Sequence, residues 1–174
     1  QKEAQTVSKP FRLVTLDPGH FHAALVQKSM YPDVDSVVHV YAQAGTDLDE
    51  HLKRIDGYNS RPENPTRWTE TVYTGSDFLE KMLADKSGNV VVLAGNNRHK
   101  TDYIRKAVEA KLHVLADKPM CIDSAGFEKL KTAFQTAKAN NVLLYDIMTE
   151  RSEITTMLQR ELSQIPEIFG DLQK

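Results

Sequence analysis

Short apolar runs alternate with segments of helical periodicity along nearly the whole chain. Runs of strand length cover residues 11–16, 37–42, 69–73, 89–95, 112–116 and 142–147, and helical spacing is found in 21–30, 47–55, 76–84, 101–110, 123–139 and 152–163. Continuous apolar strands separated by amphipathic helices are typical of a parallel sheet that is buried on both faces. We therefore predict a doubly wound, mostly parallel α/β fold of about six strands, with helices on both faces.

A sheet of this kind binds its ligand outside the carboxyl ends of its strands. The segments that follow predicted strands are 17–22, 43–47, 95–100, 117–120 and 146–151, and each is polar, rich in small residues or contains proline. The functional side chains are expected among these segments.

Charge and composition narrow the class of protein. The chain has 174 residues and a net charge of −2, so there is no basic surplus with which to neutralise a nucleic acid. No apolar run approaches the roughly 18 residues that a membrane-spanning helix needs. The single cysteine, Cys121, permits no internal disulfide and says little about compartment.

The first ten residues, QKEAQTVSKP, are polar and lack an initiator methionine. We expect residues 1–10 to form a flexible tail, left either by trimming or by removal of a leader. The compartment stays open: cytoplasmic, or exported if a leader was removed.

The turn after the first predicted strand, in VTLDPGHFHAALV (14–26), lies where a dinucleotide-binding domain carries its phosphate loop. It has one glycine, Gly19, where the G-x-G-x-x-G pattern has three. The backbone N–H groups of residues 20–23 open the next helix and would face a pyrophosphate. Ala23 could supply the close contact between helix and strand that a third glycine usually allows.

The same turn contains His20 and His22, whose spacing could also hold a metal ion. An H-x-H after a first strand resembles the metal-dependent amidohydrolases, but their fold is a barrel of about 250 residues. A metal site also needs ligands after later strands, and among the other histidines only His99 is placed at a strand end. We expect no metal ligands here, and the two histidines could also be turn residues without chemistry.

The segment AVEAKLHVLADKPMCIDSAGFEKL (107–130) resembles the Glu-Lys-Pro segment of the Gfo/Idh/MocA oxidoreductases, with Asp117, Lys118 and Pro119 in those three positions. Upstream, VVLAGNNRHKTDYIRKAVEA (91–110) is similar to the family's T-P-N-x-x-H region, where Asn97 falls on the family's Asn and Lys100 on its His. Downstream, 141–162 resembles the strand and helix that close the family's cofactor domain. The resemblance covers about residues 11–174.

This resemblance implies a Rossmann-like dinucleotide-binding domain over residues 11–165. Residues 166–174 would begin a linker to a C-terminal substrate domain that this chain lacks, together with that domain's catalytic residues. The full-length protein would be an NAD(P)-dependent oxidoreductase acting on CH–OH groups of a sugar or cyclitol-like substrate, and a homo-oligomer. The part seen here would bind the cofactor but be inactive alone.

The resemblance also implies roles for individual residues. Lys118 is the expected catalytic group, acting on the reacting hydroxyl or carbonyl, with partial burial easing its deprotonation and Asp117 pairing with it. The expected cofactor-binding residues are Gly19, His20, Phe21, His22, Gln43, Asn97, Lys118 and Pro119.

Gln43 occupies the place where NAD-binding domains usually carry an acidic residue for the ribose hydroxyls. Its amide can bind a ribose without repelling a 2′-phosphate, so NAD is favoured and NADP stays possible. Two alternatives remain: a non-catalytic dinucleotide-sensing module, which would have no use for Lys118, and a metal-dependent hydrolase that uses His20 and His22.

Overall fold

The computed structural model describes residues 9–171 and contains one six-stranded sheet. Its strands are β1 (Leu13–Leu16), β2 (Val37–Ala42), β3 (Thr69–Thr74), β4 (Val90–Leu93), β5 (His113–Ala116) and β6 (Leu144–Asp146). They lie in the order β3-β2-β1-β4-β5-β6, and every neighbouring pair is parallel. This confirms the predicted doubly wound sheet. The predicted tail over 1–10 falls mostly on residues 1–8, which lie outside the described residues.

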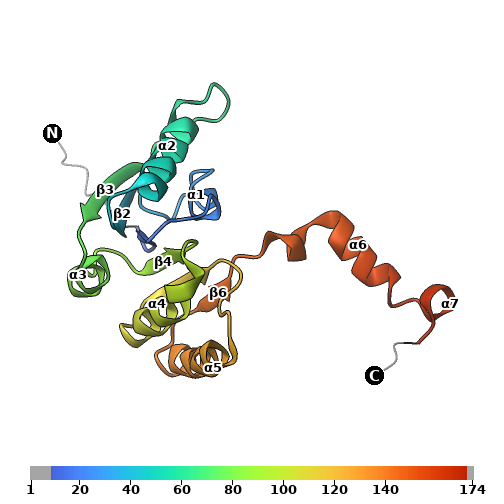
Figure 1. Ribbon diagram of the computed structural model, residues 1–174. Coiled ribbons are helices and arrows are strands. Elements are labelled where there is room, and N and C mark those ends of the chain that lie inside the picture. Colours follow the sequence, from blue (N-terminus) through green and yellow to red (C-terminus); the bar gives the residue numbers. More distant parts are fainter. Residues whose placement is uncertain (1–8, 172–174) are drawn as a thin grey trace.

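The helices are α1 (His22–Leu25), α2 (Thr46–Ser60), α3 (Phe78–Asp85), α4 (Asn97–Glu109), α5 (Ser124–Ala139), the 3₁₀ turn η1 (Thr149–Ser152), α6 (Ile154–Leu162) and α7 (Pro166–Phe169). The sheet separates them into two layers, with α1 and α2 on one side and α4 and α5 on the other (Figure 1). Alternate residues of each strand face opposite layers, as the pleat of a strand requires. Val14 and Leu16 join the core cluster of α3, α4 and α5, whereas Leu13 joins that of α1 and α2.

The predicted helix over 21–30 is wrong in length, because only one helical turn forms there. Two residues past the end of α1, the carbonyl of Gln27 accepts a hydrogen bond from Nε1 of the buried Trp68 at 2.6 Å. The predicted helix over 152–163 forms as α6 but begins later, at Ile154, because Glu153 is extended and caps it by accepting a hydrogen bond from the N–H of Thr156.

Helices α6 and α7 extend away from the sheet (Figure 1). Neither has a buried residue, although Ile154, Ile168 and Phe169 are large and apolar. Within residues 9–171, no helix combines the length and apolar character that crossing a membrane would need.

The open sheet, with β3 and β6 as its edges, is not a barrel. The amidohydrolase alternative required a closed barrel, so the fold removes the ground for that interpretation.

Candidate functional site

The strand order reverses between β1 and β4, and the loops that follow these two strands touch. The N–H groups of Gly19 and His20 both donate to the carbonyl of Ala94, at 3.1 and 2.9 Å. Pro18 forms an isolated bridge with Gly95. A crevice at such a reversal is where doubly wound sheets bind ligands.

Two glycines permit this contact. A Cβ on Gly95 would lie 2.0 Å from the carbonyl oxygen of Asp17, and one on Gly19 would lie 3.3 Å from both Gly95 Cα and Asp47 Oδ2. Gly19 is not left-handed, so close approach rather than an unusual φ requires the glycine; Asp17, with φ of 48°, is the left-handed residue of this loop. The sequence analysis did not single out Gly95, although its place directly after a strand was a signal.

The prediction that the N–H groups of residues 20–23 all face a pyrophosphate is wrong, because three of the four have acceptors within the protein. His20 donates to Ala94, Ala23 donates to the carbonyl of His20 at 3.0 Å, and His22 has a long contact of 3.4 Å with Nδ1 of His20. Across the described residues, the N–H of Phe21 is the one of the four without a hydrogen-bond partner.

Two hollows adjoin this loop on the β2 side. The larger, about 420 Å³, lies past the end of β2 and is lined by residues including Gln43, Gly45 and Asp47. The smaller, about 170 Å³, lies between the loop and α2, where Phe21 and Arg54 are among the lining residues. Gln43 is exposed at the larger hollow, which is the place where the sequence analysis expected it.

On the other side of the reversal, a lysine is buried in the first turn of α4. Lys100 is 2% exposed, and its Nζ donates to Asn97 Oδ1 at 2.7 Å and to the carbonyl of Asp117 at 3.1 Å. Burial lowers the pKa of Lys100. The sequence analysis noted Lys100 only by family position and missed it as a buried cation, though it falls on the inward stripe of α4 with Ile104 and Ala107.

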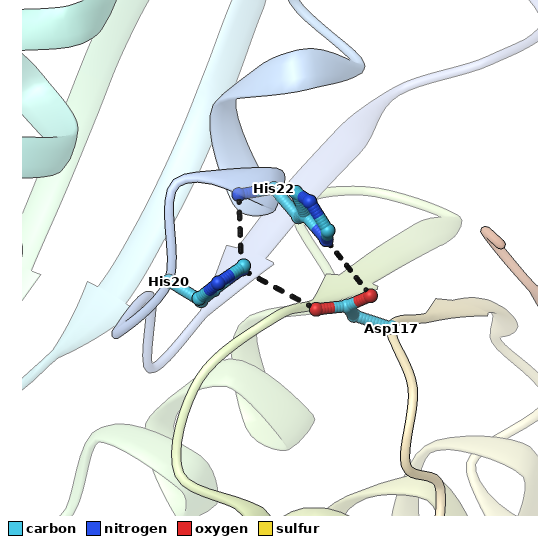
Figure 2. Close-up of side chains that lie close together, drawn as sticks. All are labelled: His20, His22 and Asp117. Atoms are coloured by element: carbon cyan, nitrogen blue, oxygen red, sulfur yellow. Dashed lines mark hydrogen bonds and ion pairs between the residues drawn. The ribbon is translucent and has the colours of Figure 1, made fainter. Parts of the chain in front are cut away.

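Asp117 follows β5 and is also buried, with 3% of its surface exposed. Figure 2 shows its carboxylate between the two imidazoles of the β1 loop: Oδ1 lies 3.0 Å from Nδ1 of His22, and Oδ2 lies 3.5 Å from Nδ1 of His20. Oδ1 also accepts from the backbone N–H of Lys118 at 2.9 Å. The predicted pairing of the Asp117 and Lys118 side chains is therefore wrong, since no ion pair joins them within the described residues.

The side chains of Lys118 and Pro119 are exposed. The expected partial burial of Lys118 is wrong for this chain, because β5 ends at Ala116 and only Asp117 turns inward after it. Lys118 lies close enough to His20 to influence it electrostatically. The pKa of His20 is lowered by burial first and by His22 next, and Lys118 contributes in the same direction.

Asp17 adds a further acid that the sequence analysis did not weigh. Its Oδ2 accepts from the hydroxyl of Tyr103 at 3.2 Å, and burial raises the pKa of its carboxyl. One edge of the sheet thus combines backbone loops and hollows with a free amine, two imidazoles and a buried carboxylate. Such groups can bind a polar ligand and exchange protons with it.

Comparison with known proteins places this arrangement in a family. Residues 19–146 match the profile of the Gfo/Idh/MocA oxidoreductase family, NAD-binding Rossmann fold. No curated protein matches the sequence. The crystal structure of a candidate oxidoreductase from Parabacteroides merdae shares 61% identity, with a TM-score of 0.91 over 97% of this chain.

Two more distant structures share the fold. The WlbA dehydrogenase of Bordetella pertussis, solved with NADH and UDP-GlcNAcA, has a TM-score of 0.64, 16% identity and covers 92% of this chain. The scyllo-inositol dehydrogenase of Lactobacillus casei has a TM-score of 0.62, 14% identity and covers 94%. This chain spans 38%, 41% and 44% of the Parabacteroides, Bordetella and Lactobacillus chains.

The family match covers most of the described sheet, including the β1 loop from Gly19 and the segment with Asp117 and Lys118. The chain belongs to the Gfo/Idh/MocA oxidoreductase family and forms its NAD-binding Rossmann fold.

Proposed function

We propose that this chain is the cofactor-binding part of a nicotinamide-dependent oxidoreductase that acts on a CH–OH group of a sugar or cyclitol-like alcohol. The observation that carries the proposal is the exposed side chain of Lys118, placed just past β5 beside the loop that follows β1. Two structures of the same fold are those of an inositol dehydrogenase and of a dehydrogenase with a bound sugar nucleotide, and they support the substrate class.

The residues of the β1–β2 side fit the adenosine part of NAD. Gln43 and Asp47 line the larger hollow and can hydrogen-bond ribose hydroxyls. Gly19 leaves the backbone accessible, and the N–H of Phe21 is a donor for a phosphate oxygen. Arg54 lines the smaller hollow and could pair with a 2′-phosphate, so NADP is the second choice.

The residues of the β4–β5 side fit the reacting end. Bound NAD supplies the redox chemistry. Lys118 donates a hydrogen bond to the alcohol oxygen and exchanges its proton as the oxidation state of that carbon changes. Asn97 and Pro119 border the same region, and both would contact the cofactor. The side chain of Asn97 accepts a hydrogen bond from Lys100. Asp117 positions the backbone of Lys118 through its N–H.

An exposed Lys118 is a weak acid–base group, so the active enzyme needs more protein around it. We propose that residues 11–165 are the cofactor domain and that 166–174 lead into a substrate domain that covers Lys118. The apolar side chains of α6 and α7 support this part of the proposal, since Ile154, Ile168 and Phe169 are 72%, 63% and 62% exposed. In this proposal the complete protein is a homo-oligomer.

The test compares this chain with the complete protein that contains it. NADH titration followed by fluorescence should show binding to both, while oxidation of inositols or nucleotide sugars by NAD⁺ should occur only with the longer protein. Turnover by residues 1–174 alone would contradict the proposal. Binding of NADH without turnover of any sugar or cyclitol by the longer protein would favour the sensing module instead.

A further inference from the structure

The cluster of His20, His22 and Asp117 is not explained by dinucleotide binding alone. Its members come from two different loops, since His22 and Asp117 are 95 residues apart in sequence. One ligand atom from each residue, both imidazoles through a ring nitrogen and the acid through a carboxylate oxygen, lies within 4.8 Å of the others. Figure 2 shows both rings turned toward the carboxylate.

The hydrogen bonds within this cluster cannot all be satisfied together. Nδ1 of His20 accepts the backbone N–H of His22 at 3.4 Å, which requires a lone pair on that nitrogen. The same nitrogen lies 3.5 Å from Oδ2 of Asp117, which also offers only lone pairs when ionised. A proton on Nδ1 would satisfy Asp117 but leave the N–H of His22 without its acceptor. A cation between Nδ1 and Oδ2 would satisfy the carboxylate and take up that same lone pair, so it would replace the long 3.4 Å contact with the N–H of His22.

The charge of Asp117 is a second reason to expect a cation in this cluster. Its side chain is 4% exposed, and a buried carboxylate is costly unless a positive group compensates it. Among residues 9–171, no Lys or Arg nitrogen forms an ion pair with it. The buried Lys100 donates to the carbonyl oxygen of Asp117 rather than to its carboxylate. The positively charged side chains nearby therefore do not neutralise the carboxylate, and the side chains that contact it are those of the two histidines.

The spacing suits a metal ion. Zinc binds imidazole nitrogen and carboxylate oxygen at about 2.0–2.2 Å, so ligand atoms around a tetrahedral ion lie about 3.3 Å apart. The two imidazole nitrogens lie 3.0 Å from Oδ1 and 3.5 Å from Oδ2 of Asp117, and one ligand atom from each residue lies within 4.8 Å of the others, so small side-chain shifts would close the three around an ion. The side chain of His20 is 40% exposed, so an ion has a path from solvent and room for a further ligand.

We propose that His20, His22 and Asp117 bind a divalent ion of the zinc class, with a water molecule in the open fourth position. Two imidazoles and one carboxylate suit borderline transition metals rather than Mg²⁺ or Ca²⁺, which prefer oxygen ligands. The sequence predicted no metal site, because the barrel fold of the amidohydrolases did not fit and only His99 among the other histidines was placed at a strand end. Asp117 is the third ligand, supplied by the loop after β5. This inference does not depend on the proposed oxidoreductase activity.

The test is calorimetric titration of the chelator-treated protein with Zn²⁺, together with absorption spectra of the Co²⁺ form. We expect saturation at about one ion per chain and no competition from excess Mg²⁺. Loss of an outer-shell partner alone costs ~10–100-fold in metal affinity, so His20→Ala and Asp117→Asn should each weaken binding by at least about 100-fold.

His99→Ala is the matched control, because His99 is an exposed imidazole at the same edge of the sheet. It should leave the affinity for Zn²⁺ unchanged. Circular dichroism checks whether Asp117→Asn folds. If it does not, His20→Ala still tests the site, because the side chain of His20 is 40% exposed. No uptake of Zn²⁺, or equal weakening by His20→Ala and His99→Ala, would overturn the proposal.

Discussion

The two halves of the sheet's carboxyl edge are built in different ways. On the β1–β2 half, Gly19 brings the loop after β1 against Gly95 of the loop after β4, and exposed Gln43 and Asp47 line an open hollow. On the β4–β5 half, Lys100 and Asp117 are buried and hydrogen-bonded. The first half offers open space, whereas the second holds charged groups at fixed positions. In the proposed function, the first half binds most of the cofactor and the second carries the reaction chemistry.

Lys118→Ala, made in the complete protein, should give the largest effect. General acid–base groups contribute roughly 10²–10⁴-fold, so kcat should fall by that order while affinity for NADH changes less than about tenfold. Lys118→Arg should rescue only in part, because a guanidinium does not give up its proton. Steady-state kinetics and NADH titration measure both quantities. An unchanged kcat with loss of NADH binding would mean that Lys118 binds the cofactor and takes no part in the reaction. The proposed division between the two halves would then be wrong.

Gly95→Ala should have the next largest effect, this time on folding. The added Cβ would lie 2.0 Å from a backbone oxygen of Asp17, so the β1 and β4 loops must separate. Overpacking costs typically about 1–3 kcal/mol, and here no flexible side chain can yield. Gly57→Ala is the control, because a Cβ there meets nothing within 4 Å. Urea unfolding that finds both variants equally stable would contradict the proposed contact between the loops.

The alternation of strands and helices and the burial of the sheet on both faces follow from the apolar periodicity, so the fold class could be predicted from the sequence. The length of α1 could not, because the segment that follows it is held by a contact distant in sequence, from Trp68 to Gln27, 41 residues apart. Local patterns carry no record of such a contact.

The site shows the same division. The position of Lys118 after a strand was predictable from the sequence, but its exposure was not. The partners of Asp117 were also missed, because His22 reaches it from a loop 95 residues earlier. Lys100 shows that a charged residue on an inward helical stripe is a usable signal of a buried polar site.

Gly19→Val should weaken NADH binding with a smaller loss of stability than Gly95→Ala. Its Cβ would lie 3.3 Å from Gly95 Cα and Asp47 Oδ2, a distance that small shifts can relieve, while the branched side chain still obstructs the approach of a phosphate. We expect a loss of about tenfold in affinity, or 1.4 kcal/mol. Calorimetry with NADH measures it, and Gly57→Val serves as the control. Unchanged affinity would place the phosphates away from this loop.

Glu70 lies on β3, the strand beside β2, and is an exception on this open side of the sheet because it is a largely buried acid. Gln27 Nε2 donates to its Oε1 at 2.5 Å, while Glu70 Oε2 and Gln27 Oε1 are buried without partners among the described residues. Burial raises the pKa of Glu70 to about 7. A proton on this carboxyl removes the buried charge and gives one of these oxygens a donor.

Glu70→Gln should therefore have a small effect that depends on pH. The pKa is 4.5 for the unperturbed group and about 7 in the fold, so the stability that Glu70 contributes is complete below pH 4.5 and is lost as pH rises through 7. The amide cannot ionise, so the variant should gain on wild type across that window, by on the order of 1 kcal/mol at pH 8. Urea unfolding at pH 5 and pH 8 measures the gain. The exposed Glu63, changed to Gln, should show none. If the free energies of unfolding of Glu70→Gln and wild type differ by the same amount at both pH values, Glu70 is ionised at both. This open side of the sheet would then contain a buried charge, as the β4–β5 half does.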